Sequence, residues 1–414
     1  MGARLCAHTV RRLISARPLH GSLHVPYRGL QSAACRPESP SGAHPVKRTP
    51  LHAQHVALGA RMTAFGGWDM PVWYAGIAAE HTAVRTAVGL FDVSHMGEFV
   101  VHGKGATAAL RRLLTNDCAE LKAGEAQYTL LPNASGGTVD DLLVYRLEDE
   151  VYILVVNAGN IDKDRVWLLD QLRRIGSRAK LDDRSDEHGL IALQGPKAAD
   201  VLAGLTDLDV RTMAYYAFDR GPVAGRQALV SRTGYTGEDG YEIMLSNDDT
   251  PAVWDALLAA GAPHGIQPCG LGARDSLRLE AAMPLYGHEL DDETSALEAG
   301  LARFVKVAKE GLDGPAVGAE RLAREAAEGV PRKLVGLVLE DRGIARDGMG
   351  ILVDGQPVGR VTSGALTPTL DRAIALGYVP PANGAVDTVV AVDIRGRAVP
   401  ARIVRRPFYK RPRT

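Results

Sequence analysis

Apolar residues alternate between helical spacing and short strand-like runs, and this order predicts two successive series of mixed elements. In the first series, helices are expected at residues 77–88, 106–114 and 162–175, with strands at 98–102, 127–131, 142–147 and 151–156. Gly89 is expected to cap the first of these helices. The second series places strands at 190–193, 228–232 and 241–245, and helices at 196–205, 250–260 and 271–282. Both follow a strand–helix–strand–strand–helix order, which predicts two related α+β units rather than one doubly wound parallel sheet.

The pattern changes after about Pro331, where short β segments alternate with turn sequences. These segments are expected at residues 333–339, 351–353, 357–362, 374–379, 388–394 and 398–404. Short strands at regular spacing are typical of an all-β domain. The sequence therefore predicts a mixed region over residues 46–330 and a β domain over 331–414, with the boundary inside the charged stretch 315–332.

Composition narrows the possible functions. The 414 residues carry 48 basic and 49 acidic side chains, so a general nucleic-acid binder with a basic excess is disfavoured. An uncharged apolar run of about 18 residues is absent from the sequence, which argues against a membrane-spanning helix. The four cysteines form no CxxC pair, which disfavours a zinc site and a disulfide framework and fits a reducing compartment.

Residues 1–45 differ from the rest of the chain. Residues 1–37 contain six arginines and no acidic residue, a composition that resembles a mitochondrial transit peptide. An extension translated ahead of the true start is the alternative. A protein made of residues 46–414 alone is expected to be cytoplasmic. A genuine transit segment would instead place the protein in the mitochondrial matrix.

Two clusters in the first series contain candidate chemistry. Asp92, Ser94 and His95 stand close together, but triad residues meet in space rather than within four positions, so a loop that satisfies its own backbone is the competing interpretation. Asp140 and Asp141 follow Gly136-Gly137 at the start of a strand. Strand side chains alternate, so one carboxylate is expected to face inward and the other solvent. An inward one would have altered proton affinity and could serve as an acid or base. A turn aspartate is the alternative.

Two further clusters lie in the second series. The glycine-rich segment 231–242 lacks the Lys-Ser/Thr of a phosphate-binding loop and the helix of a dinucleotide fingerprint. Glu242, on the strand that leaves it, could accept two parallel N–H bonds from a planar heterocycle, or be a surface residue beside a hairpin. Arg274 stands near a helix start after Gly270 and Gly272. It could recognise an anionic group in fork geometry or form a structural salt bridge.

Eleven motifs, in order, resemble the T-protein family, the aminomethyltransferases of the glycine cleavage system, over residues 47–414. They are KRTPLH (47–52), ALGARM (57–62), FGGWDMPVWY (65–74), GLFDVSHMGE (89–98), GGTVDDLLVY (136–145), ALQGP (192–196), RTGYTGEDGYE (232–242), GARDSLRLEAAMPLYG (272–287), GRVTSGALTPTL (359–370), ALGYV (375–379) and PFYKR (407–411). Ala296 stands where the family commonly carries proline, a departure that affects loop rigidity more than chemistry.

The resemblance implies a fold and a reaction. The fold is α+β, with two related ferredoxin-like units and a C-terminal β-barrel around a central folate channel. The reaction moves a one-carbon unit from the aminomethyl-dihydrolipoyl H-protein to tetrahydrofolate, releasing ammonia and giving 5,10-methylenetetrahydrofolate. Tetrahydrofolate is then a co-substrate, and no metal, flavin or nicotinamide is expected. The expected partner is the lipoylated H-protein, with the P- and L-proteins met only indirectly and no nucleic acid or membrane.

The resemblance also implies the roles of six residues. Asp141 matches the family's essential acidic residue, and Glu242 matches its pterin-binding carboxylate. The other four match positions at the folate site: Arg274, Tyr409, Met96 and Tyr128. Tyr409 is the looser match because it lies in a variable tail.

Two rival functions share the folate-binding framework. A demethylating module of the kind attached to sarcosine or dimethylglycine dehydrogenases usually follows a flavin domain, which this sequence does not contain. A non-enzymatic relative that supports iron–sulfur assembly or RNA modification would carry a Cys-containing KGCYxGQE-like motif, and this sequence has none.

Overall fold

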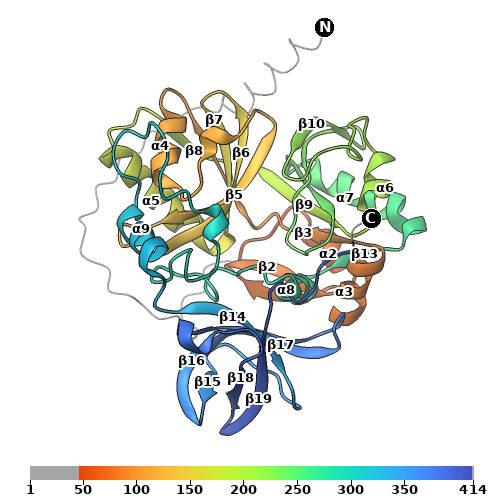
Figure 1. Ribbon diagram of the computed structural model, residues 1–414. Helices are drawn as coiled ribbons and strands as arrows, with labels where there is room; N and C mark the ends of the chain where they lie inside the picture. Colours follow the sequence, from red (N-terminus) through yellow and green to blue (C-terminus); the bar gives the residue numbers. More distant parts are fainter. Residues whose placement is uncertain (1–45, 413–414) are drawn as a thin grey trace. The chain divides into compact units, whose positions relative to one another are not determined.

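Two open β-sheets and one closed β-barrel form the framework of the computed structural model, which describes residues 46–412 (Figure 1). The arginine-rich extension predicted over residues 1–45 lies outside this described range. Within it, no helix combines the length and the apolar character needed to cross a membrane.

The first sheet has the strand order β5-β6-β7-β4-β8, with every pairing antiparallel. Its elements are β4 (Gly97–His102), α4 (Ala106–Leu113), β5 (Glu125–Pro132), β6 (Thr138–Glu148), β7 (Val151–Val156), α5 (Ile161–Arg174) and β8 (Lys180–Asp183). Without β5, the remaining strands and the two helices have the βαββαβ order of a ferredoxin-like unit.

The second sheet repeats this plan with one inserted strand. Its order is β10-β11-β12-β9-β3-β13, and β3 separates β9 from β13. Its elements are β3 (Val88–Asp92), β9 (His188–Gln194), α6 (Ala198–Ala203), β10 (Phe218–Val223), β11 (Arg226–Ser231), β12 (Gly240–Ser246), α7 (Thr250–Gly261) and β13 (Ile266–Cys269). The prediction of two related α+β units is therefore confirmed.

Gly89 does not cap a helix, contrary to the prediction. Helix α3 (Ile77–Thr86) ends earlier, and Gly89 lies within β3. A side chain there would place its Cβ 2.8 Å from Cys269 Sγ on the neighbouring strand β13. Glycine is needed at this position because β3 packs closely against both Val84 of α3 and Cys269 of β13, not because a helix ends there.

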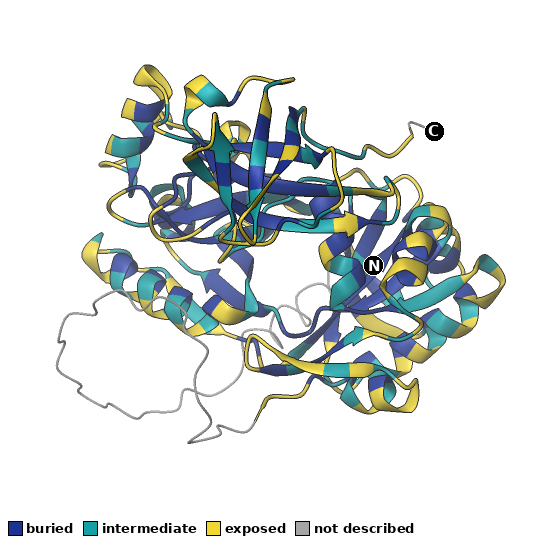
Figure 2. Cartoon of the chain, turned by 90° about the horizontal axis from the view of Figure 1, so that it is seen from below, coloured by how far each residue is buried: buried dark blue, intermediate teal, exposed yellow. Residues whose placement is uncertain are grey.

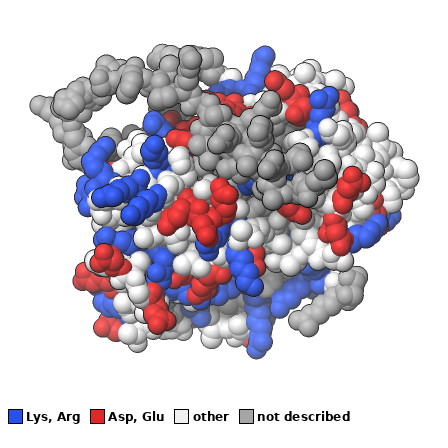
Figure 3. Space-filling view, turned by 90° about the horizontal axis from the view of Figure 1, so that it is seen from above, with Lys and Arg blue, Asp and Glu red and all other residues white. Residues whose placement is uncertain are grey.

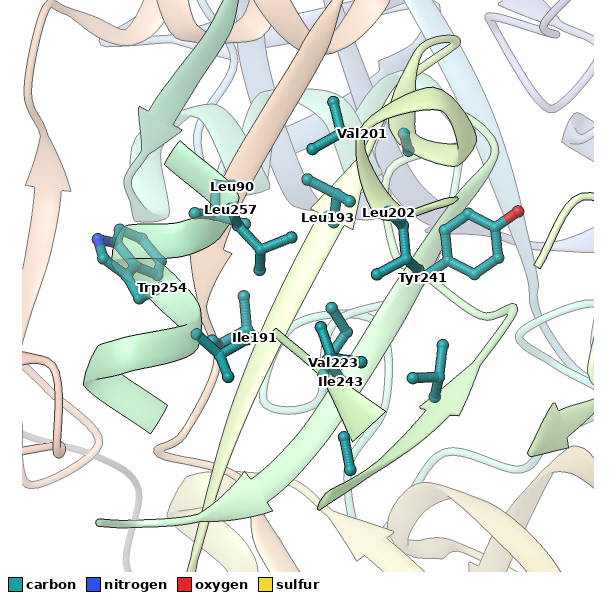
Figure 4. Close-up of a cluster of buried hydrophobic side chains, with 14 of the residues drawn as sticks. Leu90, Ile191, Leu193, Val201, Leu202, Val223, Tyr241, Ile243, Trp254 and Leu257 are labelled. Atoms are coloured by element: carbon teal, nitrogen blue, oxygen red, sulfur yellow. The ribbon is translucent and has the colours of Figure 1, made fainter. Parts of the chain in front are cut away.

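Four layers, helix on sheet on sheet on helix, enclose three apolar clusters. One cluster packs α4 and α5 on the outer face of the first sheet, and another packs α6 and α7 on the outer face of the second. Figure 4 shows the latter, where Trp254 and Leu257 of α7 lie near Ile191 of β9. A third cluster joins the inner faces of the two sheets. Both faces of the central strands are thus covered, which explains the continuous apolar run of β7, buried along its whole length. Figure 2 shows the buried strands and the exposed outer sides of the helices.

The C-terminal strands close into a barrel of order β14-β17-β16-β15-β18-β19. These strands are β14 (Lys333–Leu339), β15 (Gly350–Val353), β16 (Gln356–Thr367), β17 (Arg372–Val379), β18 (Val389–Ile394) and β19 (Arg397–Val404). Apolar side chains fill its interior, so the barrel is a packed body. The predicted C-terminal β-barrel is thus confirmed.

Helix α8 (Leu271–Glu280) connects the barrel to the second unit. Its buried Arg278 donates to Glu289 at 2.8 Å and to Ser363 of β16 at 2.9 Å. A buried charge needs such partners, because leaving it unpaired costs several kcal/mol. The contact fixes α8, and the residues it carries, against the barrel.

The remaining elements are α2 (His52–Ala57), β1 (Arg61–Phe65), β2 (Trp68–Trp73) and α9 (Ala319–Glu328). Strands β1 and β2 form a separate antiparallel pair. On the face seen in Figure 3, acidic and basic side chains are interspersed, in keeping with the near-zero net charge.

Candidate active site

A cavity of about 950 Å³ collects residues from both sheets, α8 and the C-terminal tail. All six predicted site residues line it: Met96, Tyr128, Asp141, Glu242, Arg274 and Tyr409. They come from positions more than 300 residues apart in the sequence. Its volume lies at the upper end of the range typical of small-molecule sites.

Asp141 lies on β6, in the part of the cavity formed by the first unit. Its carboxylate accepts hydrogen bonds from Tyr128 Oη at 2.8 Å and Asn157 Nδ2 at 3.0 Å. Burial, followed by the nearby Asp140 charge, raises the pKa of Asp141 to about 7. A carboxyl group that titrates near neutrality can both accept and return a proton under working conditions.

Asp140 points to the opposite side of the strand from Asp141, as strand alternation requires. It is fully buried and accepts hydrogen bonds from the Asn157 backbone N–H and from the Asn157 and Asn160 side-chain amides. The prediction that one of the two aspartates faces solvent is wrong. One is buried in a hydrogen-bonded pocket and the other lines the cavity, because β6 lies between the helix layer and the second sheet.

Glu242 lies on β12, in the part of the cavity formed by the second unit. Thr233 Oγ1 donates a short hydrogen bond to its carboxylate. Burial raises the pKa of Glu242, while the Thr233 bond and the Arg274 charge oppose that rise. The chain can approach closely here because Gly234 has no Cβ, which would otherwise overlap the Gln194 side chain. Glu242 is thus a fixed acceptor next to a cation.

Arg274 lies on the first turn of α8, where glycines 270 and 272 allow close packing against β2 and α3. Its guanidinium carbon lies 4.6 Å from the centre of the Tyr235 ring, a cation–π arrangement. Burial lowers the pKa of Arg274, but guanidinium stays charged at neutral pH. Arg274 therefore brings a fixed positive charge to the Glu242 side of the cavity.

Tyr409 enters the cavity from the tail that follows the barrel. Its backbone N–H donates to the Glu280 carbonyl at the end of α8, at 2.9 Å. The Arg85 guanidinium carbon lies 3.9 Å from the centre of its ring. Arg85 also donates to Glu280 and Glu238, so one side chain joins α3, α8, the glycine-rich loop and the tail.

Two positions at the candidate site, Asn157 and Arg85, were missed by the sequence analysis, and a third, His95, was named there only with Asp92 and Ser94. Asn157 holds both aspartates of the pair, and its position directly after the apolar strand β7 was a signal that could have been used. Arg85 gave no local signal, because its partners lie more than 150 residues away. His95 lines the cavity, and burial together with the Arg274 charge lowers its pKa to about 4, so it is neutral.

The chemistry that this arrangement can perform is proton transfer next to a bound polar ring. Within residues 46–412, no cluster of three or more His, Cys, Asp or Glu side chains is arranged to hold a metal ion. Asp141 can exchange a proton, while Glu242 and Arg274 can hold a planar donor–acceptor group. Arg303, Arg406, Lys410 and Arg411 also line the cavity and give it positive charge.

Comparisons with known proteins match this chain to one family over nearly all of the residues that the structure describes. Residues 51–309 match the family described as "GCVT N-terminal domain", and residues 332–410 match "Glycine cleavage T-protein C-terminal barrel domain". The protein named Aminomethyltransferase from Symbiobacterium thermophilum is 51% identical to this chain, and the match covers 89% of this chain and 98% of the relative. The protein of the same name from Bacillus subtilis is 46% identical, and the match covers 88% of this chain and 100% of the relative. The crystal structure of the glycine cleavage system aminomethyltransferase T from Bartonella henselae superposes with a TM-score of 0.82 at 34% identity, covering 89% of this chain and 99% of that one.

Proposed function

The chain belongs to the glycine cleavage T-protein family and is an aminomethyltransferase, and on this premise we propose that its cavity is where aminomethyl-dihydrolipoyl H-protein reacts with tetrahydrofolate. One observation carries this proposal. A single cavity contains one carboxylate poised to exchange protons, Asp141, and a second held beside a cation, Glu242 with Arg274.

The reaction exchanges two bonds at one carbon. The carbon leaves its amino nitrogen and the lipoyl sulfur, and forms new bonds to N5 and N10 of tetrahydrofolate. The two protons lost by these folate nitrogens balance the ammonia and the thiol that are released. The carbon already lies between nitrogen and sulfur and is therefore activated, so the protein chiefly holds the reactants close together and moves protons. This chemistry calls for no metal, flavin or nicotinamide.

Asp141 is the proposed catalytic residue. In its ionised form it accepts a proton from the attacking folate nitrogen, and as the acid it can return one to the departing nitrogen. The hydrogen bonds from Tyr128 and Asn157 fix its orientation. Its titration near neutrality serves both steps.

Glu242 and Arg274 are the proposed pterin-binding pair. A reduced pterin presents adjacent N–H donors on one edge, which a carboxylate accepts in parallel. The Thr233 hydrogen bond and the Arg274 charge favour the ionised form of Glu242, against the effect of burial. Tyr409, Met96 and Tyr128 supply apolar surface around the ring system.

The basic side chains of the cavity complement the carboxylates of the folate glutamyl tail. Lys410 and Arg411 of the C-terminal tail line the cavity, as does Arg303 in the short 3-10 helix Ala302–Phe304. We infer that they bind these carboxylates, because charge-assisted hydrogen bonds to carboxylates are the usual role of such a cluster.

Tetrahydrofolate-dependent ammonia release from aminomethylated H-protein tests this function. The expected result is ammonia and 5,10-methylenetetrahydrofolate in equal amounts, with lipoylated H-protein that lacks the aminomethyl group as the control. Demethylation of a methylamine without H-protein, or folate binding without turnover, would instead support one of the two rival functions. Placement in the cytoplasm or the mitochondrial matrix stays a prediction.

A further inference from the structure

A third aspartate lies behind the Asp140–Asp141 pair and has no role in the proposed mechanism. Asp164, on α5, is fully buried, as is Asp140. The carboxyl group of Asp164 meets that of Asp140 in hydrogen-bonding position. Three carboxyl groups therefore succeed one another from the helix layer to the cavity: Asp164, Asp140 and Asp141.

The available donors are divided unequally between the two buried groups. Asp140 accepts from the Asn157 backbone at 2.9 Å, from Asn157 Nδ2 at 2.8 Å and from Asn160 Nδ2 at 2.5 Å. Neither oxygen of Asp164 accepts a hydrogen bond from an N–H or O–H group of the described residues. Neither residue forms an ion pair within residues 46–412.

The charge of the adjacent Lys163 lowers the pKa of Asp164, but Lys163 forms no ion pair with either aspartate within residues 46–412, and its effect is smaller than those of burial and of Asp140. Lys163 Nζ donates to Tyr286 Oη at 2.6 Å and lies 4.1 Å from the centre of that ring. Two carboxylates in contact cannot both stay ionised in a buried site without a cation, so they share one proton. The proton belongs on Asp164, because the three amide donors stabilise the charge on Asp140. Burial, followed by the Asp140 charge, accordingly raises the pKa of Asp164 to about 11.

We propose that Asp164 is a permanently protonated acid that donates its hydrogen bond to Asp140, so that the pair presents one fixed negative charge to Asp141 from behind the cavity wall. Asp164 is then a positioning residue that acts through Asp140 and does not touch substrate. Its neutral O–H keeps Asp140 ionised and fixed, and the Asp140 charge holds the titration of Asp141 near neutrality. The kinetic consequence rests on the proposed function of Asp141, while the position of the proton does not.

Other titratable or charged groups face these carboxyl groups from the surrounding elements. They are Tyr128 on β5, Lys163 on α5, Tyr235 in the glycine-rich loop and Tyr286 in the segment after α8, and Asp291 and Asp292 act in turn on Tyr286. Burial raises the pKa of all three tyrosines above their ordinary value, so they are neutral around pH 7. Near neutrality, Asp141 is thus the group of the three-carboxyl series that changes charge.

Two aspartate-to-asparagine variants distinguish the neutral member from the charged one. Asp164→Asn replaces one neutral donor by another. The pH at which turnover is half-maximal, assigned to Asp141, should therefore shift by no more than about 0.5 pH unit, which is about threefold in proton concentration. Asp140→Asn removes the charge, so the same midpoint should move toward acid by about tenfold or more in proton concentration. Asp162→Asn, an exposed change in the first turn of the same helix, is the matched control and should leave the midpoint unchanged.

Infrared difference spectroscopy of the full chain tests the position of the proton without any activity measurement. At pH 7, the wild-type spectrum minus that of Asp164→Asn should contain the carbonyl band of one protonated carboxylic acid, and the Asp162→Asn difference should not. If Asp164→Asn moves the midpoint as far as Asp140→Asn does, or if the band is missing, Asp164 is ionised and the proposal is wrong. A wild-type protein without folate-dependent turnover would overturn the proposed function and leave the infrared result to decide this inference. If Asp140→Asn does not fold, the infrared comparison still decides.

Discussion

The two ferredoxin-like units each contribute one carboxylate to the cavity, and burial raises the pKa of both, but the charged neighbours of the two carboxylates act in opposite directions. The first unit surrounds Asp141 with amides, a tyrosine and a second aspartate, and burial with the Asp140 charge raises its pKa to about 7. The second unit places Arg274 near Glu242, so a positive charge favours its ionised form. Similar folds thus place the same functional group in two different environments, in keeping with the proposed roles of proton carrier for Asp141 and binding group for Glu242. The difference arises from the neighbours: the Asp140 charge adds to the effect of burial at Asp141, whereas the Thr233 hydrogen bond and the Arg274 charge oppose that effect at Glu242.

Loss of the proton carrier should have the largest effect. Asp141→Asn keeps the size and the hydrogen-bond acceptor of the side chain but cannot take up a proton. Turnover should fall by roughly 10²–10⁴-fold, the usual contribution of a general acid or base, while folate affinity stays within a few-fold. A coupled 5,10-methylenetetrahydrofolate assay and calorimetry measure the two quantities. Near-normal turnover would contradict the assignment, and Asp248→Asn, an exposed aspartate, is the control.

Loss of the binding carboxylate should affect affinity more than turnover. Glu242→Ala removes an acceptor for charge-assisted hydrogen bonds, which contribute about 1.5–3 kcal/mol each, so folate should bind roughly 10- to 100-fold more weakly. Calorimetric titration with tetrahydrofolate provides the measurement, and the exposed Glu328→Ala is the control. Unchanged affinity would count against a pterin role.

The same two residues should differ in how pH affects stability. The folded-state pKa of Asp141, about 7, exceeds the unfolded value, so the native state binds more protons and its stability falls as pH rises from about 4 to 7. Asp141→Asn removes this loss and should raise the free energy of unfolding at pH 8 by about 4 kcal/mol. Glu242→Gln should gain less, because Arg274 already favours the charged form. Urea denaturation at pH 5 and pH 8 compares the two, and equal gains would remove the contrast between the units.

The smallest effect is expected at Tyr409. Tyr409→Phe removes one hydroxyl group but keeps the ring against Arg85. A neutral hydrogen bond contributes about 0.5–1.5 kcal/mol, so folate affinity should fall by less than about tenfold. Fluorescence or calorimetric titration measures it. A larger loss would show that this hydroxyl group matters more than a neutral contact does.

Much of the fold was predictable because its patterns are local. The strands Val151–Val156 and Lys333–Leu339 were predicted to the residue, since continuous apolar runs bounded by polar or turn residues are strong signals. Strand β8, with the sequence KLDD, and β13, which contains a proline, were missed. These segments are strands because β8 pairs with β4 and β13 pairs with β3, and a local sequence pattern does not reveal such pairing.

The candidate site was predictable only in part, for a similar reason. Motif resemblance identified the six residues, and all six line the cavity. The environments that tune them were not predictable, because Asp164 and Arg85 act through contacts formed by folding. A motif can indicate which carboxylate is special, but the position of its proton depends on burial and on neighbours distant in the sequence.

The position of Tyr409 in the tail after the barrel also bears on synthesis. Translation delivers Met96 early and Tyr409 only after more than 300 further residues. Both ferredoxin-like units can therefore fold on the ribosome while one wall of the cavity is still missing. A nascent chain at that stage cannot yet enclose a folate. The folding of either unit alone therefore does not complete the cavity, which also needs the tail residues that follow the barrel.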